Sequence, residues 1–186
     1  MADFGEDPRA VANLILSCGE DEGLAFSNLA IQKLLYFCHA SFLVTYRKPL
    51  INGVFEAWAH GPVCRIVYDE LKHYGRSKIT ENILRRDLFT NETSLIPLPE
   101  SRRVISHVYT TVAHLGKLST GQLVNLSHKR GGAWDFVWNK GKTSVTLGNK
   151  IDDKLILDKF SLLLPISAQE DSFERDSYEA TPFAGD

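Results

Sequence analysis

The sequence lacks the features that mark membrane and secreted proteins. No apolar run approaches the ~20 residues that a helix needs to cross a bilayer. The N-terminus, MADFGEDPRA, has acids where a signal peptide would have basic residues followed by an apolar stretch. The three cysteines include no CxxC pair, so we expect them to be small, buried and reduced. We therefore expect a cytoplasmic protein that does not enter membranes.

Nucleotide-binding and common catalytic motifs are also missing. The chain has no GxxxxGK[ST], GxGxxG, GxSxG or HExxH motif and no EF-hand loop. The nearest approach to a metal site is Cys38, His39, His60 and Cys64, whose spacing matches no zinc signature. A nucleophilic Cys64 assisted by His60 or His39 stays open by spacing alone, although a buried thiol is the simpler interpretation.

What the sequence does have is the composition of a globular domain with an uneven distribution of charge. Of its 186 residues 44% are hydrophobic and 24% charged, which suffices for a packed core. Residues 166–186 hold six acids and one base, a net charge of -5, so the overall charge of -2 leaves +3 for residues 1–165. We therefore predict a folded domain over residues 1–165 and an acidic tail over residues 166–186 that is disordered when alone.

Helical periodicity and capping signals predict a mainly helical chain. Asp7, Ser27 and Ser119 each stand where a helix N-cap is expected, and Ser119 is followed by Gln122 at the spacing of a capping box. The predicted helical segments are residues 7–19, 28–44, 61–75, 100–115, 119–130 and 152–164.

One segment alternates like a strand. Residues 54–60 carry apolar side chains at every second position, and we expect them to pair with residues 49–51 through the Asn-Gly turn between them. Gly61 and Pro62 predict the start of the next helix, and residues 91–99 have the composition of a loop. The predicted fold class is mainly α: a compact single-domain bundle of about six helices with one small β-hairpin and a disordered acidic C-terminal tail.

Two motifs hold more polar residues than core packing requires. QKLLYF keeps Lys33 and Tyr36 among apolar neighbours, and FEAWAHGPV places Glu56, Trp58 and His60 on one face of the predicted strand. Lys33 and Glu56 could pair across the contact between helix and hairpin. Trp58 is expected to anchor the hairpin, with its indole N–H on a backbone carbonyl.

Taken in order, three motifs resemble the Panacea domain, also called the SocA-like antitoxin domain or the GepA-like phage-associated family. They are IQKLLYFCHASFLV, PLINGVFEAWAHGPVCRIVYDELKHYG and LSTGQLVNLSHKRGGAW, and the resemblance covers residues 8–164. His60 departs from the tyrosine of many relatives, and Arg65-Ile66 from a Pro-Glu-like pair. The matching residues that we assign to the scaffold are Gln32, Trp58, Gly61, Pro62, Tyr68, Tyr74 and Trp134.

The resemblance implies an antitoxin, encoded beside its toxin in bacteria or their phages, that neutralises a cognate protein toxin by direct stoichiometric binding. It implies no enzyme activity, no catalytic residue, no metal and no cofactor. Operator DNA and a second copy of the chain stay open as further partners, and a membrane is not expected. Our candidate toxin-contact residues are Lys33, Tyr36, Glu56, His60, Phe173, Tyr178 and Phe183.

The tail aromatics are included because they stand among acidic residues. That pattern suits a segment that folds on a basic partner surface with its aromatic side chains as anchors. A tail that only solubilises the protein, or that serves as a handle for proteases, is the plain alternative.

Two other functions compete with toxin binding. The first is a DNA-binding regulator of its own operon, for which residues 115–123 offer a turn between two helices. Its further support is a set of basic doublets, Arg47-Lys48, Arg85-Arg86, Arg102-Arg103 and Lys129-Arg130, which DNA binding would require on one face. The second is a hydrolase that uses Cys64 or His60.

Overall fold

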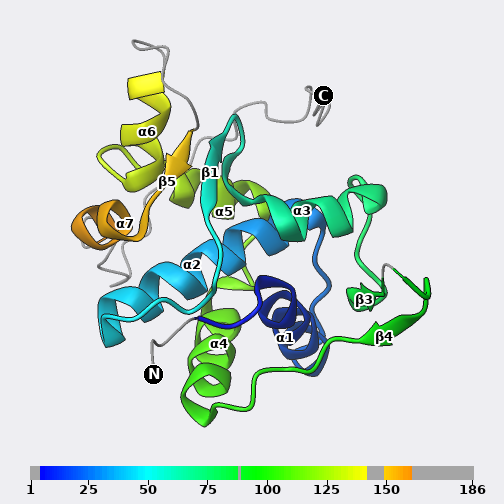
Figure 1. The fold of residues 1–186 in the computed structure, drawn as a ribbon. Coiled ribbons are helices and arrows are strands. Elements are labelled where there is room, and N and C mark those ends of the chain that lie inside the picture. The colour runs from blue at the N-terminus through cyan, green and yellow to red at the C-terminus, as the bar shows by residue number, and fades with distance from the viewer. Residues whose placement is uncertain (1–4, 88, 142–148, 161–186) are drawn as a thin grey trace.

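The computed structural model describes residues 5–87, 89–141 and 149–160, and in this part of the chain seven α-helices form the body of the domain, with a small sheet packed on one side of the central helix α2 (Figure 1). The helices are α1 (Pro8–Asp21), α2 (Asn28–Tyr46), α3 (Arg65–Leu71), α4 (Arg102–Leu115), α5 (Thr120–Ser127), α6 (Ala133–Gly141) and α7 (Asp153–Phe160), with a 3₁₀ turn at Lys72–Tyr74 after α3. The mainly α class is confirmed. The tail at 166–186 lies outside the described residues.

The strands form two separate sheets. One has the order β2-β1-β5, and the other is the hairpin β3-β4. Their bounds are β1 (Phe55–Trp58), β2 (Gly61–Cys64), β3 (Leu84–Arg86), β4 (Thr93–Leu95) and β5 (Lys150–Ile151).

Helix α2 crosses the middle of the molecule and is buried on nearly its whole circumference (Figure 1). It packs against α1, α4, α5, α7 and the strand β2. The helix begins where the Ser27 hydroxyl accepts a hydrogen bond from the Ala30 N–H, and it ends where Arg47 takes a left-handed conformation with φ 57°. Because every position from 31 to 40 is buried, α2 carries the polar residues of the first motif into the interior of the domain.

Local capping signals give the helix starts correctly. The Asp7 carboxylate caps α1 by accepting from the Arg9 N–H, and Ser119 and Gln122 form a reciprocal capping box on α5. Helix α1 nevertheless runs two residues beyond Gly19, its expected end. Gly19 instead allows a close approach, because an added Cβ would lie 2.4 Å from the Phe26 ring.

The predicted pairing of residues 54–60 with residues 49–51 is wrong. Strand β1 pairs antiparallel with β2 across a two-residue turn, and its other edge pairs with β5. The predicted helix start at Gly61 and Pro62 is wrong for the same reason, since both residues belong to β2 and α3 begins at Arg65. Hydrogen bonds from α2 to the β2 backbone hold this segment extended.

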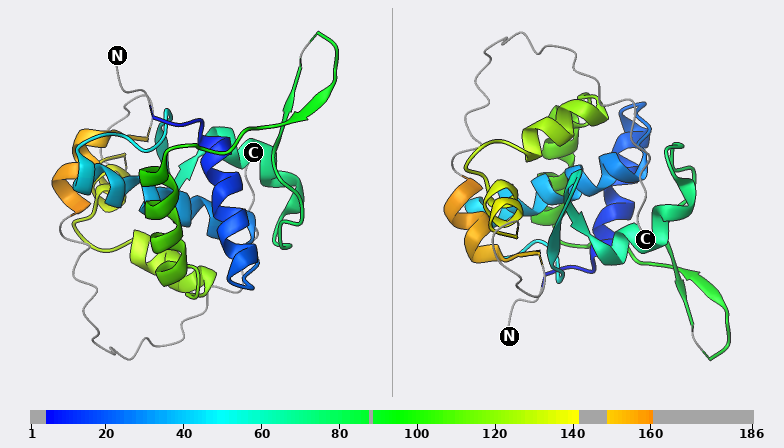
Figure 2. Two further views of the ribbon diagram at one scale, coloured as in Figure 1. Left: turned by 90° about the horizontal axis from the view of Figure 1, so that it is seen from below. Right: turned by 90° about the horizontal axis from the view of Figure 1, so that it is seen from above.

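Three further segments differ from the expectation. Part of the predicted loop at 91–99 is the strand β4, which with β3 forms a hairpin that projects from the body (Figure 2). The aromatic-rich residues 134–138 lie in α6, a helix that the sequence did not reveal. The last predicted helix begins at Asp153 and is described as far as Phe160.

Candidate functional site

The three motifs meet at the β1–β2 hairpin. From α2, the Gln32 side-chain oxygen accepts a hydrogen bond from the Cys64 N–H at 2.9 Å, and the Lys33 amine donates to the Pro62 carbonyl at 2.8 Å. From α6, the Trp134 indole N–H donates to the carbonyl of Trp58 at 2.9 Å. Side chains from a helix that precedes the hairpin and from a helix that follows it therefore hold the hairpin in a fixed position on the domain.

Lys33 is buried completely, with 0% of its side chain exposed. Within the described part of the chain its amine donates one hydrogen bond, to the Pro62 carbonyl, and no carboxylate pairs with it. Burial alone holds the pKa of Lys33 well below its ordinary value, because a charged ammonium is poorly solvated inside a protein. The predicted pair between Lys33 and Glu56 does not form.

Glu56 and Trp58 bind each other instead. The Trp58 indole N–H donates to a Glu56 carboxylate oxygen at 2.9 Å, not to the backbone carbonyl that we expected. The Trp58 ring packs against Tyr68 with ring centres 4.8 Å apart. Both side chains lie on the half-exposed face of β1, so the outer face of the hairpin has a fixed acidic and aromatic surface.

Gly61 allows α2 and α5 to approach the hairpin closely. Its φ is +98°, a conformation that L side chains rarely adopt, and an added Cβ would lie 2.6 Å from the Ser127 hydroxyl oxygen and 3.0 Å from the Lys33 nitrogen. Ser127 is itself buried and donates from its hydroxyl to the Val124 carbonyl. Lys33 and Ser127 therefore pack directly beneath the hairpin turn.

His128, the next residue, completes this cluster. Its ring stacks on Trp134 with centres 3.7 Å apart and planes 6° apart, and its buried Nε2 atom has no hydrogen-bond partner among the described residues. Burial, the nearby charge of Lys33 and that of His60 lower the pKa of His128 to about 4, against a smaller opposing effect of Asp135. We call Lys33, Ser127 and His128 the sub-hairpin cluster.

Ser127 and His128 lie in the third motif, but they were not among the predicted site residues. A serine and a histidine at the end of a helix are typical of a helix terminus. Only the packing of α5 against β2 places them beside Lys33.

The structure separates the candidate toxin-contact residues into two groups. Lys33 and Tyr36 are 0% and 1% exposed, so a partner that docks on this surface does not touch them, because α2 is the centre of the core. Glu56 and His60 are half-buried and reach the surface of the hairpin, where contact with a toxin stays a prediction. The tail candidates Phe173, Tyr178 and Phe183 lie outside the described residues.

Among the scaffold residues, Tyr68 and Trp134 are buried against the hairpin and Tyr74 is half-buried at the end of the 3₁₀ turn.

Within the described residues, the candidate metal ligands Cys38, His39, His60 and Cys64 form no cluster that could hold a metal ion. Cys18, Cys38 and Cys64 are buried free thiols, and burial raises the pKa of each, which disfavours the reactive thiolate. His39 pairs with Asp153 at 3.0 Å across the α2–α7 contact. Within the described ranges, no three His, Cys, Asp or Glu side chains lie close enough together to hold a metal ion.

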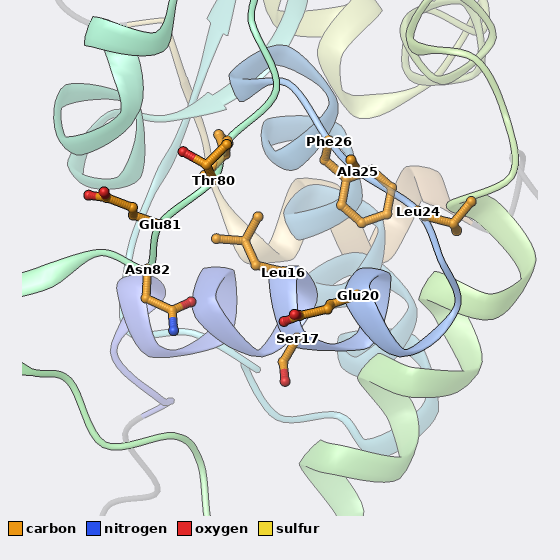
Figure 3. A pocket seen from close by; sticks show the side chains of 10 residues that line it. Leu16, Ser17, Glu20, Leu24, Ala25, Phe26, Thr80, Glu81 and Asn82 are labelled. Atoms are coloured by element: carbon orange, nitrogen blue, oxygen red, sulfur yellow. The ribbon is translucent and has the colours of Figure 1, made fainter.

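A separate pocket of about 330 Å³ opens between the second half of α1 and residues 79–82 (Figure 3). Leu16 and Phe26 give it apolar walls, and Glu20 and Glu81 add two carboxylates. A cationic group with an aliphatic stem would suit this combination. No predicted site residue lies in the pocket.

No helix in the part of the chain that the structure describes is long and apolar enough to cross a bilayer.

Comparison with known proteins adds two findings. The family model described as "Antitoxin SocA-like, Panacea domain" matches residues 31–135, from the first motif to the third. Antitoxin SocA of Caulobacter vibrioides (strain NA1000 / CB15N) is 39% identical over 154 residues, which cover 83% of this chain and 82% of that protein. No solved structure matches the chain.

Proposed function

Because this chain belongs to the SocA-like antitoxin family, whose members carry the Panacea domain, we propose that it is the antitoxin of a toxin–antitoxin pair. It neutralises its cognate protein toxin by direct binding in a fixed molar ratio and catalyses no reaction in doing so. The same family assignment supports a toxin encoded beside it as its partner.

The observation that carries this proposal is the pre-organised β1–β2 hairpin. Bonds from α2 and α6 fix its backbone, so its half-exposed side chains lose little conformational freedom when a partner binds. Glu56, Trp58 and His60 offer a carboxylate, an indole and an imidazole on this hairpin. Fixed aromatic and polar side chains of this kind are common anchors in protein–protein interfaces.

Co-expression with the neighbouring reading frame tests the proposal. That frame should be lethal when expressed without this chain and harmless with it. With purified proteins, inhibition of the toxin should reach completion at a fixed molar ratio, should not increase with time, and should survive a chelator. Rescue by substoichiometric amounts that grows with incubation would contradict direct neutralisation and would favour an enzyme.

Charge reversal separates contact by the hairpin from contact by the tail. Glu56→Arg should weaken toxin binding if the hairpin is the interface, whereas Glu100→Arg, at an exposed position away from it, should not. The triple variant Phe173→Ser, Tyr178→Ser, Phe183→Ser tests the tail in the full-length chain. Loss of protection in the triple variant alone would place the interface on the tail.

A second function, binding to operator DNA, is favoured by one observation. Helices α4 and α5 are joined by only residues 116–119, the arrangement that a helix-turn-helix requires. Helix α5 carries no lysine or arginine, so phosphate contacts would come from Lys129 and Arg130 beyond its end. A gel shift on the upstream DNA across a salt series tests this function independently of toxin binding.

A further inference from the structure

We propose that two copies of this chain form a two-fold symmetric dimer in which the β3–β4 hairpin of each copy lies over the α1 pocket of the other. The α1 pocket is the cavity of about 330 Å³ between the second half of α1 and residues 79–82. In this dimer an arginine of one copy pairs with two carboxylates of the other. The proposal is independent of toxin binding, since it needs only this chain.

The first observation is an exposed apolar face on the β3–β4 hairpin. Leu84 and Leu95 stand opposite each other in the register of the two strands, so their side chains lie on one face. They are 40% and 71% exposed, and Phe89 in the connecting turn is 98% exposed. The hairpin projects from the body, and every residue of its two strands is exposed (Figure 2). Large apolar side chains that gather on a surface in this way are typical of an interaction site.

The second observation is an unpaired cation on the same face. Side chains alternate between the two faces of a strand, so Arg86 projects on the side of Leu84 and Arg85 on the opposite side. Arg86 is exposed, and within residues 5–87, 89–141 and 149–160 it forms no ion pair. This face of the hairpin therefore combines two aliphatic side chains with a guanidinium group, which has five N–H donors.

The α1 pocket offers the complementary surface. Leu16 and Phe26 form apolar walls, and Figure 3 shows the Leu16 side chain pointing from α1 toward the segment that carries Glu81. Glu20 of α1 and Glu81 bring carboxylates from the two sides of the pocket, and neither has an ion pair among the described residues. A planar guanidinium can donate to two carboxylates at once, which makes an arginine the best-suited occupant.

The position of Glu20 makes a counter-charge especially favourable. Glu20, Asp21 and Glu22 follow one another at the end of α1, where the helix dipole already places partial negative charge, and the last turn holds no basic residue. The Asp21 carboxylate accepts from the Tyr109 hydroxyl, and Glu22 pairs with Lys117 at 3.8 Å. Of the three carboxylates, that of Glu20 is left without a partner in the described part of the chain. A cation from a second copy would relieve a repulsion that a single copy leaves in place.

A second copy of the chain carries the matching chemistry. None of the described residues between 84 and 95 lines the pocket of its own chain, because the hairpin points away from the body (Figure 2). Residues 79–82 lead through Ile83 into β3, so the pocket and the hairpin adjoin each other in every copy. A two-fold axis beside this junction brings each hairpin over the pocket of the other copy and forms the same contact twice.

Sedimentation of the full-length chain over a concentration series tests the proposal. The wild type should change from monomer to dimer as the concentration rises. Arg86→Glu, and the double variant Glu20→Arg, Glu81→Arg, should each raise the dimer dissociation constant by about tenfold or more, because each places like charges together across the interface.

Two matched controls change the same charges elsewhere. Arg85→Glu alters the opposite face of the hairpin, and the double variant Glu100→Arg, Asp158→Arg alters exposed positions outside the pocket. Both should dimerise as the wild type does. A dimer that Arg86→Glu leaves unchanged, or that the controls weaken as much as the test variants do, would overturn the proposal.

An equimolar mixture of Arg86→Glu with Glu20→Arg, Glu81→Arg gives the sharpest result. In the mixed dimer one contact joins Arg86 to an intact pocket, and the other joins the substituted side chains, which again have opposite charges. The mixture should therefore dimerise about as tightly as the wild type, although neither variant does so alone. A mixture that stays monomeric would overturn the proposal, as would a wild type that stays monomeric at every concentration and so leaves the hairpin to a different protein.

A measurement on the wild-type dimer covers the case in which a variant does not fold. In a mixture of isotope-labelled and unlabelled chains, nuclear Overhauser effects between copies should connect the Leu95 methyl groups with the side chain of Leu16. A dimer without this contact, formed through another surface, would overturn the proposal as well.

Discussion

Gly61 stands at a position where backbone conformation and packing both require glycine. Its φ of +98° strains any L residue, and a Cβ would overlap the Ser127 hydroxyl at 2.6 Å. We expect Gly61→Ala to lower the free energy of unfolding by about 2 kcal/mol or more, measured by urea titration. Gly121→Ala is the matched control, because a Cβ at that helical position meets nothing within 4 Å and should stabilise the protein by about 0.5 kcal/mol. Equal stabilities of the two variants would show that the hairpin adapts to the added methyl.

His128 should make the domain sensitive to acid. Its pKa is about 4 in the folded protein against an ordinary value of 6.5, so between these pH values the unfolded chain binds more protons than the folded one. The free energy of unfolding should therefore fall as the pH drops from about 6.5 to about 4. Above about pH 6.5 His128 should add nothing to the pH dependence of that free energy. His128→Phe keeps a ring on Trp134 and should reduce the slope of the free energy of unfolding against pH, measured by urea titration. Some slope should persist, because burial also lowers the pKa of His107. Identical slopes would contradict this assignment.

Among the elements, the β3–β4 hairpin is attached to the body only at its base, where Ile83 and Ile96 are buried in the core and a side chain of α1 binds the backbone of Ile83. The Asn13 amide of α1 donates to the Ile83 carbonyl at 2.9 Å and accepts from the Ile83 N–H at 2.8 Å. Every residue of both strands is exposed, and a two-stranded hairpin alone is marginally stable. Asn13 therefore substitutes for the strand neighbour that this hairpin lacks at its base.

Removing the Asn13 amide should allow the β3–β4 hairpin to open more often than the core. Asn13→Ala leaves both backbone groups of Ile83 without partners and should destabilise the protein by about 2 kcal/mol. Amide hydrogen exchange should accelerate in residues 84–95 and remain slow in α2. If amide exchange accelerated equally across the domain, the β3–β4 hairpin and the core would open together.

How far the sequence predicted these elements depended on whether the signal was local. The capping box of Ser119 and Gln122 needs only neighbours along the chain, and the structure has it where the sequence indicated. A Gly-Pro pair such as Gly61-Pro62 is also found at the start of helices. Here hydrogen bonds between α2 and β2, which join residues 29 and 32 positions apart, hold the segment in a strand. The predicted contact within the candidate site was wrong for the same reason. Lys33 and Glu56 were plausible partners by spacing, and only three-dimensional packing showed that Lys33 is buried and Glu56 binds an indole.

On the scale of the whole molecule, charge is divided along the chain. Residues 1–165 have a net charge of +3 and residues 166–186 one of -5. If the tail contributes to the proposed toxin contact, affinity should fall as ionic strength rises from about 0.01 to about 1 M, because the screening length shrinks from about 30 to about 3 Å. Replacing Glu170, Asp171 and Glu174 by their amides should flatten this dependence in a calorimetric titration. Salt-independent affinity would exclude an electrostatic contribution of the tail.

Two of the long-range hydrogen bonds form only late in the synthesis of the chain. The bond between Trp134 and the β1–β2 hairpin joins residues 76 positions apart, and the bond between His39 of α2 and Asp153 of α7 joins residues 114 positions apart. At 5–20 residues per second a ribosome needs roughly 10–40 s for 186 residues. Nascent chains lack a locked hairpin for most of that time. If the chain neutralises a toxin as proposed, a cell that meets free toxin is protected by the chains it has already finished, and the supply of these depends on how slowly they are degraded.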